Sequence, residues 1–261
     1  MDYALPLISV IMPAYNCSSF IAASIVSALN QTHSNIELIV IDDCSSDDSF
    51  LLAKEYERCD SRVKLYKNDQ NIGVALTRNR AFALASGEFI ALLDADDIWH
   101  SEKLEKQLAF MLDSHCDLCY TAYSFISETG ASLGNPYFVP NKLNLKVLLR
   151  ENVIGCSSVL MRASIVKSIP MRNEFAHEDY VFWLELMQQG VTACGLNEVL
   201  MDYRIVTGSR SANKWKSAMN RWRIYRTLLH LNVFEASRLF VSYAMRGLAK
   251  HIVHMVPIPV K

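Results

Sequence analysis

Four short apolar runs alternate with helix-length segments in the first 114 residues, and this alternation constrains the fold most strongly. The runs occupy residues 7–12, 36–41, 63–66 and 89–93. Each has the length and nearly unbroken apolar character of a strand that is buried on both faces, as strands of a parallel sheet are. Strands that alternate with helices and short loops predict an α/β fold with a doubly wound, parallel sheet.

Small polar residues mark the expected starts of the connecting helices. The predicted caps are Ser18 or Ser19, Ser45 or Ser46, and Ser101. Asp47 and Asp48 would then lie in the first turn of the second helix, where acidic residues are favoured. A turn at 71–73 precedes a third helix that runs through residue 84. The predicted buried face of the fourth helix carries Leu104, Leu108 and Leu112.

The second half of the chain is less regular. Strands are predicted at 118–126, 157–161 and 199–205, helices at 143–150 and 180–189, a loop or hairpin at 130–140 and a polar loop at 207–213. A helical pattern returns at residue 214, followed by a second helix over about 235–251. Its first apolar stripe comprises Trp215, Met219, Trp222, Tyr225 and Leu229. We therefore expect a main domain over 1–211 and a basic amphipathic helical tail over 212–261.

Composition favours a packed cytoplasmic protein. Hydrophobic residues make up 51% of the 261 residues and charged residues 20%, which is typical of a chain with a core. The start lacks a signal peptide, and no apolar run reaches the roughly 18 residues of a spanning helix. Seven scattered cysteines predict reduced thiols. Cys116 and Cys119 are interpreted as buried positions of a strand, without a second pair at zinc spacing.

Charge is distributed unevenly along the chain. Residues 204–261 carry eleven Lys or Arg and one acid, a net charge of +10, so residues 1–203 carry −11. Such a tail indicates an anionic partner, either a membrane surface or nucleic acid. Basic residues that interleave with aromatic ones favour the headgroup region of a membrane. Two alternatives are that the apolar stripe packs on the main domain or forms a dimer interface.

Two carboxylates follow the fourth predicted strand. Asp94 and Asp96 are separated by one residue, directly after the apolar run 89–93. Ligands of open α/β sheets bind at the carboxyl ends of strands. A divalent cation held by one or two carboxylates usually completes its shell with substrate phosphates. The pair therefore predicts a metal clamp for a nucleotide diphosphate, and the alternative is a solvated acidic turn.

The polar segments at the strand ends resemble those of a known family. They are Ser9-Val10-Ile11-Met12-Pro13-Ala14-Tyr15-Asn16, Ile41-Asp42-Asp43-Cys44-Ser45-Ser46-Asp47, Asn71-Ile72-Gly73, Thr77-Arg78-Asn79, Asp94-Ala95-Asp96-Asp97 and Glu178-Asp179. In order and spacing they resemble the inverting glycosyltransferases of family 2, over roughly residues 5–211. The detail is similar to bacterial enzymes of surface polysaccharide synthesis, including the teichuronic acid type. The resemblance implies a GT-A fold, with a Rossmann-like, mixed, mostly parallel sheet and a C-terminal helical extension.

The resemblance also implies roles for residues of the nucleotide site. The implied nucleotide-binding residues are Pro13, Ala14, Tyr15, Asn16, Asp43, Asn71, Gly73, Arg78, Asp94 and Ala95. Among them, Tyr15 would lie near uracil, and Asp43 would accept a hydrogen bond from the base. Asp96 would be the main ligand of Mn²⁺ or Mg²⁺, with Asp94 beside it. The alternatives are a helix-surface arginine at Arg78 and a turn or capping residue at Asp43.

An inverting transfer also needs a base for the acceptor hydroxyl. The resemblance implies Asp179 for this role, with Glu178 orienting the acceptor or a loop beside the diphosphate. The alternative is that both acids cap the helix expected at 180–189. Arg204 and Arg210 would belong to a loop that closes over the diphosphate, or would be solvated loop arginines. The segment 155–158 would line the sugar or acceptor pocket, or pack as a plain strand.

These expectations combine into one function. The chain is predicted to be a metal-dependent inverting glycosyltransferase that moves a sugar from a UDP-sugar to a glycan acceptor. The acceptor would be linked to polyprenyl diphosphate, in bacterial envelope polysaccharide synthesis at the cytoplasmic face of the inner membrane. No nucleic acid is expected as a partner, and an oligomer is compatible with the sequence. The alternatives are a nucleotidyltransferase and a non-catalytic nucleotide-sugar-binding scaffold.

Overall fold

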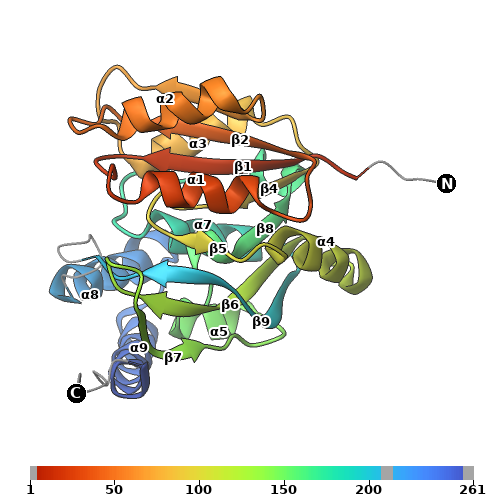
Figure 1. Ribbon diagram of the computed structural model, residues 1–261. Coiled ribbons are helices and arrows are strands. Elements are labelled where there is room, and N and C mark those ends of the chain that lie inside the picture. The colour runs from red at the N-terminus through yellow and green to blue at the C-terminus, as the bar shows by residue number, and fades with distance from the viewer. Residues whose placement is uncertain (1–4, 207–213, 255–261) are drawn as a thin grey trace, which may run out of the picture.

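One mixed sheet forms the centre of the molecule (Figure 1). The computed structural model describes residues 5–206 and 214–254. The strand order is β3-β2-β1-β4-β8-β6-β9-β5, and β7 pairs with β6 outside this path. In Figure 1 the sheet extends from the region of α1 and α2 at the top to β7 and α9 at the bottom. The predicted α/β architecture with a C-terminal helical extension is confirmed.

The parallel part of the sheet is built from the four apolar runs of the sequence. These strands are β1 (Ile8–Ala14), β2 (Ile36–Asp42), β3 (Val63–Lys67) and β4 (Phe89–Leu92). The connecting helices are α1 (Ile21–Leu29), α2 (Ser49–Cys59) and α3 (Val74–Leu84). Because β1 pairs in parallel with both β2 and β4, the loops after these strands meet at the same edge of the sheet.

The second part of the sheet mixes directions. It contains β5 (Ile98–Trp99), β6 (Leu118–Ile126), β7 (Ser132–Tyr137), β8 (Val159–Arg162) and β9 (Ala193–Arg204). Its helices are α4 (Lys103–Ser114), α5 (Leu145–Arg150), α6 (Ala163–Val166) and α7 (Glu178–Gln188), with a 3-10 turn at Cys156–Ser158. β8 runs antiparallel to both β4 and β6, and β9 runs parallel to β6. The hairpin expected at 130–140 is formed by β7 and β6.

The first two helices begin later than the expected serine caps. α1 starts at Ile21 and α2 at Ser49, so both aspartates expected in the first turn of α2 precede it. Asp47 gives the reason, because its Oδ1 accepts a hydrogen bond from the Ser49 amide at 3.0 Å and its Oδ2 one from the Ser18 amide at 3.0 Å. This carboxylate joins the loops after β1 and β2 instead of serving as an interior residue of the helix.

The buried face of α4 differs from the predicted leucine stripe. Leu104 and Leu108 are buried, but Leu112 is 50% exposed and Met111 is fully buried instead. A spacing of four residues drifts around a helix of 3.6 residues per turn, so the third leucine of the series leaves the core face. Lys103 is fully buried on the same face.

Lys103 is a lysine at the start of α4 whose side chain is buried in the core. Its Nζ donates to Gln107 Oε1 at 2.6 Å and lies 4.1 Å from the centre of the Trp99 ring. Burial lowers the pKa of this lysine from 10.5 to about 7. The unfolded chain therefore binds more protons than the native protein between those two pH values, and the free energy of unfolding rises with pH across that window.

We expect Lys103→Met to remove this pH dependence. In the wild type the slope approaches about 1.4 kcal/mol per pH unit, the limit for one proton, and in the variant it falls toward that of the remaining groups. Urea unfolding between pH 7 and 9.5 measures both slopes. Lys167→Met, which alters an exposed lysine, is the control. Equal slopes for wild type and Lys103→Met would contradict the assignment.

The C-terminal helices pack on the main domain. They are α8 (Lys214–Arg223), a π-helical segment (Ile224–Leu228) and α9 (Val233–His254). Tyr225 is fully buried and donates its hydroxyl to the Leu149 carbonyl at 2.5 Å. The Arg221 guanidinium lies 3.4 Å from the centre of the Tyr180 ring on α7. The alternative that the apolar stripe packs on the main domain therefore holds for Tyr225.

The predicted apolar stripe is only partly correct. Trp215 and Met219 are 82% and 65% exposed, while Tyr225 is buried. Trp215 and Met219 lie on α8, before the π-helical segment. Within that segment the Leu229 amide donates to the Ile224 carbonyl five residues earlier. This wider turn shifts the residues that follow it around the axis, so Leu229 does not continue the spacing of an ideal α-helix.

Two expectations about the whole chain can be compared with the structure. Within residues 5–206 and 214–254, no helix has the length and apolar character needed to cross a membrane. Cys116 and Cys119 are fully buried free thiols. Cys119 lies in β6 as expected, but Cys116 precedes this strand, which begins at Leu118.

Candidate functional site

A cavity of about 770 Å³ opens at the carboxyl ends of β1, β2 and β4. It is lined by every residue predicted for the nucleotide, metal and base sites, with the exception of Arg204 and Arg210: Pro13, Ala14, Tyr15, Asn16, Asp43, Asn71, Gly73, Arg78, Asp94, Ala95, Asp96, Glu178 and Asp179. Residues from β6, β9 and the segment after α5 form the opposite wall. The predicted set is therefore brought together in one place.

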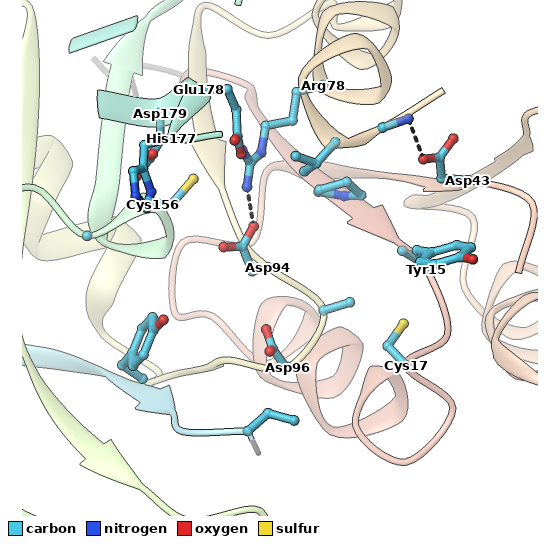
Figure 2. Close-up of a pocket in the computed structure, with 18 of the residues that line it drawn as sticks. Tyr15, Cys17, Asp43, Arg78, Asp94, Asp96, Cys156, His177, Glu178 and Asp179 are labelled. Carbon is cyan, nitrogen blue, oxygen red and sulfur yellow. Dashed lines mark hydrogen bonds and ion pairs between the residues drawn. The ribbon is translucent and has the colours of Figure 1, made fainter. Parts of the chain in front are cut away.

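Figure 2 shows the order of these groups along the cavity. Tyr15 and Asp43 lie toward one end and Asp179 toward the other, with Asp94 between them. This order matches the order of groups in a nucleotide sugar, with a base at one end, a diphosphate in the middle and a sugar beyond it.

Asp43 organises the loop at the end of the cavity where Tyr15 lies. Its carboxylate accepts hydrogen bonds from Asn68 Nδ2 at 2.7 Å, from the Ile72 amide at 2.9 Å and from the Gly73 amide at 2.9 Å. Gly73 has a φ of +86°, in the left-handed region that suits glycine. Oδ2 accepts one of these bonds, which leaves it capacity for a donor from a ligand.

The loop after β1 is held by the loop after β2. Asn16 adopts a φ of +47°, its amide donates to Ser45 Oγ at 3.0 Å, and its Oδ1 accepts from the Ser46 amide at 2.8 Å. These serines, expected as helix caps, fix Asn16 instead. The preceding Tyr15 is 52% exposed along the cavity, so its ring is available for stacking on a base.

Buried hydrogen bonds hold the acidic loop 94–97 rigidly. Ser157 Oγ accepts from the Asp94 amide at 2.9 Å and donates to Asp97 Oδ2 at 2.5 Å. Ser24 Oγ lies 2.9 Å from the Ala95 carbonyl oxygen, toward which it can donate. Asp97 is thus structural, and Ser157 supports the loop from below. Asp94 and Asp96 are left to line the cavity.

The electrostatics of the two cavity carboxylates suit a cation. Burial, followed by the nearby charge of Asp94, raises the pKa of Asp96 to about 6. Two adjacent carboxylates of this kind gain from a divalent ion between them. Across the described residues, no cluster of three or more His, Cys, Asp or Glu forms a complete metal site. A pair of carboxylates that needs substrate oxygens fits Mg²⁺ or Mn²⁺.

Arg78 connects the middle of the cavity to the end where Glu178 and Asp179 lie. It is 2% exposed, and its guanidinium donates from Nη2 to Asp94 Oδ1 at 2.5 Å and from Nη1 to Glu178 Oε1 at 2.9 Å (Figure 2). The alternative of a helix-surface arginine is therefore wrong. Because Glu178 is buried against Arg78, the carboxylate of this acidic pair that suits proton transfer is Asp179.

Asp179 lies in the first turn of α7, beside Glu178. Burial, together with the Glu178 charge, raises the pKa of the Asp179 carboxyl above its ordinary value. A carboxylate with a raised pKa is a stronger base than one in water. The helix start also favours an acid at this position, so the capping alternative and the catalytic one are compatible.

Arg204 turns away from the predicted position above a diphosphate. Neighbouring residues of a strand point to opposite faces, and Tyr203 lines the cavity. The Arg204 guanidinium donates to the carbonyl oxygens of Asp96 at 2.7 Å and Ser127 at 2.9 Å. These bonds fasten the acidic loop to the end of β6. Arg210 lies outside the described residues.

An aromatic wall was not anticipated. Tyr123 and Phe125 on β6 and Tyr203 on β9 line the cavity, and the ring centres of Tyr123 and Phe125 are 5.4 Å apart. Asn152 and Ile154 after α5 also line it, and so do Gly155 and Cys156 from the segment expected there. The period-two spacing of Tyr123 and Phe125 was the available signal, since it places both on one face of a strand.

Solved structures share this fold. Staphylococcus aureus TarS 1–349 in complex with UDP-GlcNAc matches with a TM-score of 0.72 at 20% identity, over 93% of this chain and 72% of that one. The mannosyltransferase PcManGT from Pyrobaculum calidifontis, in complex with GDP-Man and Mn²⁺, matches with a TM-score of 0.69 at 13% identity, over 98% and 77%. The architecture is the GT-A fold of glycosyltransferases.

Sequence comparison assigns the family. A model described as Glycosyl transferase family 2 matches residues 9–169. TuaG of Bacillus subtilis (strain 168), provisionally named a teichuronic acid biosynthesis glycosyltransferase, is 38% identical over 95% of this chain and 98% of its own. The Escherichia coli UDP-Glc:alpha-D-GlcNAc-diphosphoundecaprenol beta-1,3-glucosyltransferase WfgD is 36% identical over 94% and 95%. The chain belongs to glycosyltransferase family 2 and is a glycosyltransferase.

Proposed function

We propose that the protein transfers a sugar from a UDP-sugar to a glycan acceptor linked to polyprenyl diphosphate, with inversion and with a divalent metal, in bacterial envelope polysaccharide synthesis. The observation that carries the proposal is the single cavity that lines up Tyr15 and Asp43, the Asp94–Asp96 pair, and Asp179. The name of WfgD supports a UDP-sugar donor and a diphosphoundecaprenol-linked acceptor. The free thiols and the membrane-bound acceptor favour action at the cytoplasmic face of the inner membrane.

The nucleotide would be held at the end of the cavity formed by β1, β2 and α3. Tyr15 would stack on the base, and the open lone pair of Asp43 Oδ2 would accept a hydrogen bond from it, which suits the N–H of uracil. Asp94 and Asp96 would hold the metal, which when bound supplies positive charge for the diphosphate leaving group. The rigid 94–97 loop would fix that position.

Asp179 would act as the general base at the other end. It would take the proton of an acceptor hydroxyl as that oxygen attacks the anomeric carbon from the face opposite the diphosphate. The new C–O bond would form while the bond to UDP breaks, so a UDP-α-sugar would yield a β-linkage. Arg78 and Glu178 would position the carboxylates, and the aromatic wall would contact the acceptor.

Two other functions are less well supported. A nucleotidyltransferase would want a glycine-rich, basic loop after β1, where this chain has Pro13-Ala14-Tyr15-Asn16. A scaffold that only binds nucleotide sugars would not need Asp179, whose raised pKa suits proton transfer.

UDP release from a panel of UDP-sugars with Mn²⁺ or Mg²⁺ tests the proposal without a known acceptor. We expect slow release with one donor, its loss on chelation with EDTA, and its loss in Asp96→Ala. Asp113→Ala, which changes an exposed acid on α4, should behave as wild type. Calorimetric titration with UDP and Mn²⁺ should show weaker binding for Asp96→Ala. Release that is unaffected by EDTA would contradict the metal, and absence of UDP binding would contradict the donor.

A further inference from the structure

A second groove lies between α5 and α9, outside the catalytic cavity. Its volume is about 440 Å³. Lys146 and Arg150 from α5 and Arg238 from α9 line it, together with the apolar Leu149, Phe234 and Leu239. In Figure 1 α9 lies at the lower end of the molecule, beside β7. The groove therefore combines residues of the main domain with residues of the C-terminal extension.

The positive charge of this groove is not neutralised. Lys146, Arg150 and Arg238 are exposed and have no ion pair with any residue that the structure describes. The acid of the groove, Glu235, is directed to the start of α9, where its Oε2 lies 3.4 Å from the Asn232 amide and its own amide donates to Asn232 Oδ1 at 3.0 Å. This reciprocal arrangement is a helix cap.

The apolar side of the groove is uncovered. Phe234 is 80% exposed and Val233 next to it is 59% exposed. Large apolar side chains beside unpaired cations are typical of surfaces that enter the headgroup region of anionic membranes. Nucleic acid would use the cations but would leave the aliphatic side chains unexplained.

We propose that the α5–α9 groove docks onto the surface of an anionic phospholipid bilayer, with Phe234 inserted between lipids and the three cations on lipid phosphates. This proposal concerns membrane binding and not the transfer reaction. It places the membrane-binding surface on α5 and α9, whereas the sequence predicted it on the basic tail alone. Tyr225 and Arg221 of that tail are buried against the main domain, whereas α5 contributes two of the three cations. Arg150 is two residues from Asn152, which lines the catalytic cavity, so docking would place the membrane near one wall of that cavity.

Co-sedimentation of the full chain with vesicles tests the charged part. We expect binding to phosphatidylglycerol/phosphatidylcholine vesicles that weakens with salt, and little binding to pure phosphatidylcholine. Lys146→Gln/Arg150→Gln should lower the apparent affinity by roughly tenfold or more, from the contribution of each cation near an anionic surface. The control Arg58→Gln/Lys167→Gln removes two exposed charges elsewhere and should change it far less. Equal losses for both variants would overturn the groove assignment.

Phe234→Ser tests the apolar part against Leu51→Ser, since Leu51 is 62% exposed on α2. We expect Phe234→Ser alone to reduce vesicle binding. UDP release in solution should be unchanged in the groove variants, which separates this proposal from the catalytic one. Light scattering gives a further readout: a dimer that Phe234→Ser converts to a monomer, without vesicle binding by the wild type, would overturn the proposal in favour of a subunit interface.

Discussion

Asp179→Asn is expected to lower the rate of sugar transfer by about three orders of magnitude while UDP binding with Mn²⁺ is retained. General base catalysis by a positioned carboxylate typically contributes factors of about 10² to 10⁴, and an amide cannot accept the proton. Burial and the Glu178 charge raise the pKa of Asp179, so the wild-type rate should rise with pH as this carboxyl ionises. That acidic limb should be absent from the residual activity of the variant.

The measurement is acceptor-dependent transfer, with UDP affinity determined separately by calorimetry. Asp113→Asn serves as a control for the same chemical change at an exposed position of α4. A variant that keeps more than a tenth of the wild-type rate, with the acidic limb unchanged, would exclude Asp179 as the base. Loss of UDP binding together with activity would instead indicate a structural defect.

Arg78→Met is expected to destabilise the protein by about 3–5 kcal/mol, the usual cost of removing one partner from a buried ion pair. The guanidinium serves both Asp94 and Glu178, and Glu178 is 4% exposed, so its charge would remain buried after losing the cation that faces it. Arg78→Lys should rescue only part of the loss, because an ammonium lacks the planar fork that reaches two carboxylates.

Urea unfolding gives the free energies. Arg80→Met, on the same helix but exposed, is the control. The double variant Arg78→Met/Glu178→Gln should recover part of the stability, because it also removes the buried negative charge that Arg78 faced. If Arg78→Met matches Arg80→Met in stability, the bridge does not contribute as described.

The meeting of these residues in one cavity could be predicted because the rules that govern it are local. Strands of a parallel sheet end at one edge, so the residues after β1, β2 and β4 had to meet. The placement of the Asp94–Asp96 pair follows from that rule, whereas the role proposed for Asp43 came from family resemblance. The position of α7 at this edge of the sheet could not be predicted in the same way. Nothing in the periodicity places Asp179 opposite Asp94, and its assignment came from family resemblance.

The errors arose where tertiary contacts decide. Asp47 accepts hydrogen bonds from two loops, and α2 therefore begins later than the serine caps indicate. Rules for helix caps consider only neighbouring residues and do not include such a contact. The family resemblance places Arg204 over the diphosphate. Because neighbouring residues of a strand point to opposite faces, only one of Tyr203 and Arg204 can face the cavity, and it is Tyr203. The π-helical segment at 224–228 interrupts the α-helical spacing of the tail, and Lys103 is buried in a core that its type normally avoids. The hydrogen bonds of Asp47 and Arg204 reach partners distant in sequence, whereas the polar contacts of Lys103 and the π-helical bond lie within five residues.

The two walls of the cavity come from separate stretches of the chain, and this has a consequence for how such enzymes diversify. The wall that we assign to the nucleotide is built mainly before residue 97, whereas Tyr123, Phe125, Asn152 and Ile154 line the other wall. Under the proposed function, substitutions in the later stretch would change which glycan is extended without altering the nucleotide that is bound. New polysaccharide linkages would then evolve through substitutions in one wall of the cavity, while the wall assigned to the donor stays the same.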